Sequence, residues 1–175
     1  PVGSFPAAFN FPGTASVDPV GLIPWSVIIF LAVIILMDFV MKKLPIGRYT
    51  YAIGGNEEAA RVAGINVDKV KVLVYLIEGA LLGLAGTLMA SRLKSAAPAL
   101  GAGYEGDAIA GAIIGGVSFT GGIGTVWGMV LGAVMIGVIN NGMDLIGVEA
   151  FYKQLVKGSI IILAVLIDRK RSGRS

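Results

Sequence analysis

Long apolar runs alternate along the chain with shorter polar segments, and the lengths of the apolar runs are the first clue to the fold. No charged residue occurs between Trp25 and Met37. A helix over 23–41 would rise about 1.5 Å per residue, or about 28 Å in total, which matches the hydrocarbon core of a bilayer. Comparable runs cover 69–93, 126–141 and 150–167. The pattern therefore predicts an all-α integral membrane protein, a multi-span helical bundle whose spans occupy these four ranges.

One polar stretch, residues 51–69, interrupts this apolar sequence and contains its own helix signals. Asn56 can accept hydrogen bonds from the first free N–H groups of a helix, and Glu57 and Glu58 suit the positive end of the helix dipole. Gly64 can adopt the left-handed conformation that ends a helix. These signals predict a two-turn helix over 57–63. Because so short a helix is marginal alone in water, it is either a structured loop between spans or a surface helix that sits in another protein's groove.

Basic residues are concentrated near this polar stretch, which indicates its side of the membrane. They are Lys42, Lys43, Arg48, Arg61, Lys69 and Lys71. The positive-inside rule predicts that this segment, and the basic tail after residue 167, lie in the cytoplasm. Because successive spans cross the membrane in opposite directions, we expect the segments 1–20, 94–106 and 143–149 to lie outside the cell membrane. Asp68 is expected to cap the second long helix.

A glycine-rich region separates the second and third long spans. We expect Asp107 to cap a short or re-entrant helix over 107–118, which at about 17 Å crosses only part of a bilayer. The glycines that follow predict a break held inside protein or water. Thr125 is expected to cap the next helix. Gly124, Gly128 and Gly132 form a GxxxGxxxG ladder, which suits close packing of backbones. No Lys-Ser or Lys-Thr follows the glycines, which argues against a phosphate-binding loop.

Several ionisable and amide side chains lie within the predicted spans. Glu78 is either a functional group or a hydrogen-bonded side chain that joins helices. Asp38 is expected to meet Lys42 or water. Asn140 and Asn141 are candidates for a path that passes a neutral polar substrate, because amides both donate and accept hydrogen bonds. Equally, they can cap the end of their helix.

Composition narrows the chemistry further. The 175 residues are 55% hydrophobic and 14% charged, with a mean hydropathy of +0.83, whereas about a quarter of residues are charged in soluble domains. The chain has no cysteine and no histidine, so disulfides, thiolate sites and the commonest general base are excluded. We predict no catalytic residue, no metal site and no signal peptide. Since the first residue is Pro1, we expect the chain to be part of a longer protein.

The run 52–67, Ala-Ile-Gly-Gly-Asn-Glu-Glu-Ala-Ala-Arg-Val-Ala-Gly-Ile-Asn-Val, resembles the cytoplasmic signature of the permease subunits of bacterial ABC importers for monosaccharides, of the ribose, xylose and galactoside type. Further runs at 103–110, 115–125, 139–143 and 156–165 agree in the same order. The resemblance covers most of 23–171. It implies that 1–175 is a single transmembrane permease domain, the carboxyl-terminal half of such a subunit without its amino-terminal half.

The resemblance also implies partners and a location. A separate ATPase subunit is expected to bind the coupling helix 57–63 and to hold the ATP and Mg²⁺, so this chain needs no cofactor and is not an enzyme. Its expected contacts are Asn56, Glu57, Glu58, Ala59, Ala60, Arg61 and Gly64. An extracytoplasmic sugar-binding protein and a second permease copy complete the importer in the lipid of the bacterial inner membrane. The carboxyl terminus is cytoplasmic, and no nucleic acid is expected.

Other functions remain open from the residues alone. The same kind of permease also serves nucleosides or branched-chain amino acids. An ion-coupled carrier or channel would use Glu78 and the broken glycine segment. An intramembrane enzyme is disfavoured, because Asp38 and Glu78 lie in different spans and there is no histidine or cysteine.

Overall fold

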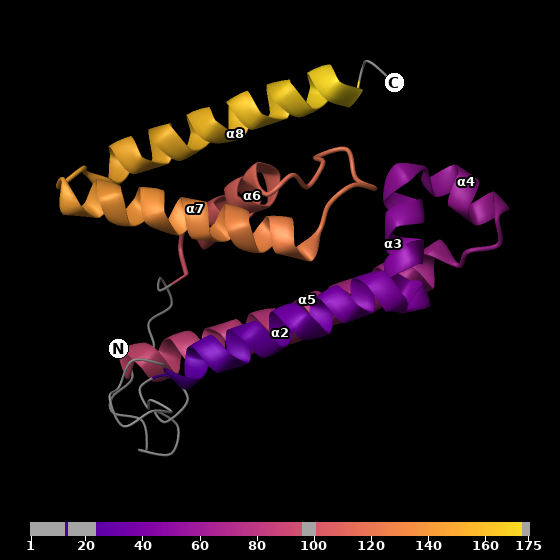
Figure 1. Ribbon diagram of the computed structural model, residues 1–175, viewed down its shortest axis with the longest axis horizontal. Helices are drawn as coiled ribbons and strands as arrows, with labels where there is room; N and C mark the ends of the chain where they lie inside the picture. The colour runs from indigo at the N-terminus through magenta and orange to yellow at the C-terminus, as the bar shows by residue number, and fades with distance from the viewer. Residues whose placement is uncertain (1–12, 14–23, 96–100, 173–175) are drawn as a thin grey trace.

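A computed structural model describes residues 13, 24–95 and 101–172, and the regular structure of these residues is α-helical (Figure 1). The helices are α2 (Trp25–Lys43), α3 (Pro45–Gly55), α4 (Glu57–Val62), α5 (Val67–Leu93), α6 (Tyr104–Ile114), α7 (Val126–Leu145) and α8 (Ala150–Ser172). Among the described helices α2, α5 and α7 are long and apolar enough to cross a membrane. They correspond to the predicted spans 23–41, 69–93 and 126–141, and α8 contains the predicted span 150–167. The predicted all-α membrane fold is confirmed.

The long helices run between two ends of the molecule (Figure 1). Helix α6 packs against α7 and α8, and α7 also contacts α2. At one end, α3 and α4 lie near the first turns of α5, and α8 finishes at this same end. The end of α5 and the connection from α7 to α8 lie at the other. This arrangement fits the predicted sidedness, in which the polar stretch and the basic tail share one side. The predicted external loop 1–20 lies outside the described residues apart from Gly13, whose N–H donates to Ser91 Oγ (2.9 Å).

Helices α6 and α7 approach each other through glycines. A Cβ atom at Gly132 would overlap the carbonyl oxygen of Gly111, and one at Gly128 would overlap that of Gly115. Such contacts between backbones require glycine on both helices, as in close-packed membrane helices. The close packing predicted for Gly128 and Gly132 is therefore confirmed, whereas Gly124 lies beside Val117 in the segment between α6 and α7 and does not take part in this contact.

The predicted break between α6 and α7 is also confirmed, although its helix has different bounds. Helix α6 begins at Tyr104 rather than at 107, after Gly103 with φ +89°. Asp107 therefore lies in the first turn and does not cap the helix. The helix ends at Ile114 instead of 118 because Gly116 is left-handed (φ +84°) and its N–H bonds back to the carbonyl of Ile113.

The helix that follows the break starts as the sequence predicts but ends later. Thr125 Oγ1 accepts a hydrogen bond from the N–H of Gly128 (3.0 Å), which confirms its role as the cap of α7. The helix continues to Leu145. Asn140 and Asn141 therefore lie within α7, and the interpretation that they cap its end is wrong.

Near the polar stretch one predicted cap is corrected and one helix is new. Helix α5 begins at Val67 and is capped by Asn66, whose Oδ1 accepts from the N–H of Lys69 (3.1 Å). Asp68, the predicted cap, lies in the first turn. Helix α3 was not predicted: Pro45 occupies its first turn, and its last turn includes the first residues of the polar stretch.

Candidate functional site

Helix α4 has the capped ends that the sequence predicts, over Glu57–Val62 rather than 57–63. At the start, Asn56 Oδ1 accepts from the N–H of Ala59 (2.9 Å). At the end, Gly64 is left-handed (φ +84°). The N–H of Ile65 donates to the carbonyl of Ala60, and that of Gly64 donates to the carbonyl of Arg61, both at 3.0 Å. Together these bonds form a Schellman motif that satisfies the last carbonyls, so this short helix has defined ends.

A network of four charges joins α4 to the start of α5. Arg61 Nη2 lies 3.1 Å from Glu57 Oε1 and 3.0 Å from Asp68 Oδ1, while Lys71 Nζ lies 2.7 Å from Glu57 Oε2. The hydrogen bonds from Lys71 and Arg61 lower the pKa of Glu57, and the bond to Asp68 raises the pKa of Arg61. Exposed ion pairs contribute little stability each, so the main effect of this network is to orient α4.

The sides of α4 differ sharply in exposure. Ala60 is only 3% exposed, whereas Val62 is 89% exposed. Asn56, Glu58, Ala59 and Gly64 are also exposed. The expectation that Ala60 contacts the ATPase subunit does not fit this geometry, because its side chain is buried within the protein itself.

Helix α3 connects this region to the glycine-rich break. The Tyr51 hydroxyl donates to the carbonyl of Gly124 (2.8 Å). A Cβ atom at Gly54 would lie 2.5 Å from the nitrogen of Gly122, so the two backbones touch. Displacement of α3 therefore reaches the segment between α6 and α7 directly. Sequence reasoning missed this contact, and the glycine pairs at both places are its only local signal.

A polar cluster joins α6, α7 and α8. Asn140 Nδ2 donates to Asp107 Oδ2 (3.0 Å), and Lys157 Nζ lies 2.6 Å from Asp107 Oδ1. The Asp107 and Lys157 side chains are 22% and 20% exposed. Asn140 Oδ1 is buried and has no hydrogen-bond partner among the described atoms. Lys157 on α8 therefore supplies the cation that faces Asp107.

The other candidate path residues do not join this cluster. Asn141 is exposed on α7, and Glu78 is exposed on α5. The most apolar window of α5 contains no buried residue. The three residues proposed for a substrate path therefore do not converge. Asp38 behaves as expected and pairs with Lys42 (2.9 Å).

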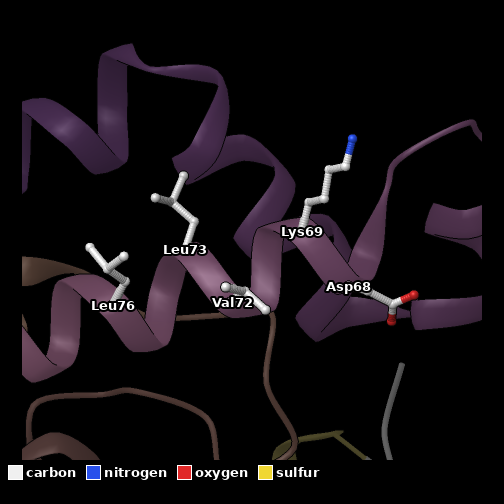
Figure 2. Close-up of a pocket in the computed structure, with 5 residues that line it drawn as sticks. All are labelled: Asp68, Lys69, Val72, Leu73 and Leu76. Atoms are coloured by element: carbon white, nitrogen blue, oxygen red, sulfur yellow. The ribbon is translucent and has the colours of Figure 1, made fainter.

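A shallow hollow lies on α5 close to the charge network (Figure 2). It is lined by Asp68, Lys69, Val72, Leu73 and Leu76. In Figure 2 the side chains of Lys69, Leu73 and Leu76 point to one side of α5, whereas the Asp68 carboxylate points in a different direction. Three of these lining residues, Val72, Leu73 and Leu76, are apolar. In the described ranges no group of three or more acidic side chains could hold a metal ion.

Sequence comparisons identify known proteins that are similar to this chain. A family model described as "Branched-chain amino acid transport system / permease component" matches residues 1–165. The ribose import permease protein of Bacillus subtilis is 47% identical over 150 residues, which are 86% of this chain and 47% of that protein. The xylose transport system permease protein of Haemophilus influenzae is 43% identical over 146 residues, 83% of this chain and 39% of its own length.

A third relative extends the range of sugars. The D-allose transport system permease protein of Escherichia coli is 41% identical over 162 residues, 93% of this chain and 49% of that protein. The chain thus spans about half the length of the curated relatives it matches. No solved structure matches it significantly. With its membrane-length helices, the chain belongs to the family of transport-system permease components that this model describes.

Proposed function

We propose that this chain is part of the permease subunit of an ATP-driven monosaccharide importer in the bacterial inner membrane. The observation that carries the proposal is the similarity of most of the chain to permeases named for ribose, xylose and allose. The structure adds a capped polar helix, α4, between the membrane-length helices α2 and α5. A helix in this place suits a permease that receives force from a partner.

The coupling mechanism follows from the connections of α4. A partner ATPase, which holds ATP and Mg²⁺, moves α4, and the charge network transmits the motion to α5. Helix α3 directly precedes α4 in the chain and touches the glycine-rich break through Tyr51 and Gly54. In this mechanism the chain carries out no covalent step. Its part is to change the packing of membrane helices.

The passage for the sugar is the less specific part of the proposal. Sugar hydroxyls both donate and accept hydrogen bonds, as do amide side chains. Asn140 has a buried oxygen without a partner among the described atoms and is the first candidate. Asn141 and Glu78 are exposed on α7 and α5 and become path residues only if other helices of the importer cover them.

The assembly proposed here contains an ATPase subunit, an extracytoplasmic sugar-binding protein and a second permease copy. The ATPase side is the one with α3, α4 and the end of α8, so the carboxyl terminus is cytoplasmic. The basic residues near α4 support this orientation.

Uptake by the complete importer tests the function. The full-length permease is expressed with its ATPase and binding protein in a strain that lacks sugar importers, and labelled ribose, xylose, galactose, allose, leucine and uridine are supplied separately. We expect saturable uptake of at least one sugar and its loss when the ATPase is inactivated. Uptake of leucine alone or uridine alone would show that the substrate is an amino acid or a nucleoside and not a sugar. Uptake driven by an ion gradient without the ATPase would indicate a carrier.

A further inference from the structure

The side chains of α4 differ in whether they are free to contact a partner. Val62 is a large apolar side chain that is 89% exposed, at the end of the structure where the basic residues gather. Ala60, two positions earlier, is 3% exposed. Because successive helix residues are separated by about 100°, this contrast identifies an inner and an outer face.

The charged side chains on the inner face are already paired within the protein, although Glu57 and Arg61 remain 41% and 48% exposed. Glu57 and Arg61 lie one turn apart and pair with each other, with Lys71 and with Asp68. Ala60, on the same side of the helix, is buried. Residues whose charges are already paired within the chain offer little to a partner, because new contacts must first break these pairs.

The outer face consists of three residues. Ala59 and Val62 are exposed and apolar, and Glu58 is exposed beside them. In the described part of the chain no ion pair is formed by Glu58. An apolar residue with a small neighbour and one free carboxylate fits an apolar groove with a basic group at its edge. A helix of this length needs a groove about 9 Å long.

We infer that α4 divides its residues between two roles, a conclusion that rests on the proposed function. Val62, with Ala59 and Glu58 beside it, contacts the importer's ATPase subunit, and Val62 fills an apolar pocket there. Glu57, Arg61 and Ala60 seat α4 on α5 and do not touch the ATPase. The expected contact surface is therefore smaller than the whole helix, and Val62 is its central side chain.

Single cysteines can separate the two faces, because this chain has no cysteine of its own. The full-length permease, with any cysteine outside this chain replaced by serine, carries V62C or, as the matched control, A60C in inverted membrane vesicles. A maleimide reagent is expected to label the V62C thiol rapidly in the permease alone and at least tenfold more slowly with the ATPase bound. The A60C thiol is expected to label slowly in both states, since its position is buried.

Substitutions that keep the fold measure the strength of the contact. V62T has nearly the same shape with a hydroxyl group, and V62E adds a charge at an exposed position. We expect ATPase binding to weaken several-fold for V62T and at least tenfold for V62E, as for a central interface residue. The melting temperature of the purified permease serves as the control and is expected to stay unchanged.

Removal of an inner charge is expected to change the order of α4 first and ATPase binding only as a consequence. With E57Q, amide hydrogen exchange across α4 is expected to speed up, and ATPase binding weakens only because the helix is less ordered. Weaker binding with unchanged exchange would make Glu57 a direct contact and overturn the division.

Two further results would overturn the inference. One is full ATPase binding by V62E. The other is slow labelling of the V62C variant before the ATPase is added, which would place this side chain in the lipid headgroups. Failure of the proposed function looks different, because then the unsubstituted permease itself binds no ATPase.

Discussion

The cluster of Asp107, Asn140 and Lys157 predicts an unequal effect of two lysine substitutions on the same helix. K157M leaves the carboxylate of Asp107 between α6, α7 and α8 without its cation. K153M is the matched control, because Lys153 pairs with Asp144, whose side chain is 62% exposed. Both substitutions remove one positive charge from α8 and keep a side chain of similar length.

The magnitude follows from the geometry of the pair. At 2.6 Å between Lys157 Nζ and Asp107 Oδ1, with an effective dielectric constant of about 20, the attraction is about 6 kcal/mol before desolvation. The desolvation of both ions offsets much of this, and breaking a buried pair by removing one partner typically costs about 3–5 kcal/mol. Since the side chains retain about one fifth of their exposure, we expect about 2–3 kcal/mol for K157M. For K153M the expected cost is at most about 1 kcal/mol.

The assay is denaturant unfolding of the purified full-length permease in detergent, with the double variant D107N/K157M included. This variant leaves no uncompensated charge, so it should be more stable than K157M and lie within about 1 kcal/mol of the unsubstituted protein. The reasoning fails if K157M and K153M destabilise equally. It also fails if the costs of D107N and K157M simply add in the double variant.

Three other perturbations have expected outcomes. G132A should destabilise the same preparation by more than about 2 kcal/mol, because its Cβ overlaps the backbone of α6. The control G137A lies on the same helix, but its Cβ meets open space, so it should be neutral or slightly stabilising. Equal effects of the two substitutions would contradict the close approach of α6 and α7. Y51F should lower the free energy of unfolding by about 1 kcal/mol. It should also slow transport more than ATP hydrolysis, because the hydrogen bond from the Tyr51 hydroxyl to Gly124 links α3 to the glycine-rich break. An unchanged ratio of transport to ATP hydrolysis would show that this bond has no part in coupling. Because the pKa of Glu57 is lowered from 4.5, its ion pairs persist at neutral pH and are lost only as pH falls through that lowered value. The protection of the α4 amides, which is the exchange rate relative to the intrinsic rate at the same pH, should therefore fall only in acid. A loss of protection near neutral pH would refute the assignment.

Local signals in the sequence were sufficient for much of this structure. Hydropathy and length placed α2, α5 and α7, because a bilayer requires long apolar helices whatever their neighbours are. Asn56, Gly64 and Thr125 act on backbone groups within a few residues, so their capping roles were also predictable. The capping predictions were wrong at two acidic residues that lie inside a first turn, since Asn66 caps α5 in place of Asp68, and α6 begins after Gly103 and not at Asp107.

The contacts between elements came only from the tertiary structure. Asp107 and Asn140 are 33 residues apart, and nothing in either local pattern indicates that they meet each other and Lys157. Likewise, Ala60 and Val62 belong to the same short helix, and only the packing of α4 on α3 and α5 buries one and exposes the other. Capping and hydropathy depend on neighbouring residues and on the solvent, whereas the direction that a side chain faces depends on how whole helices dock.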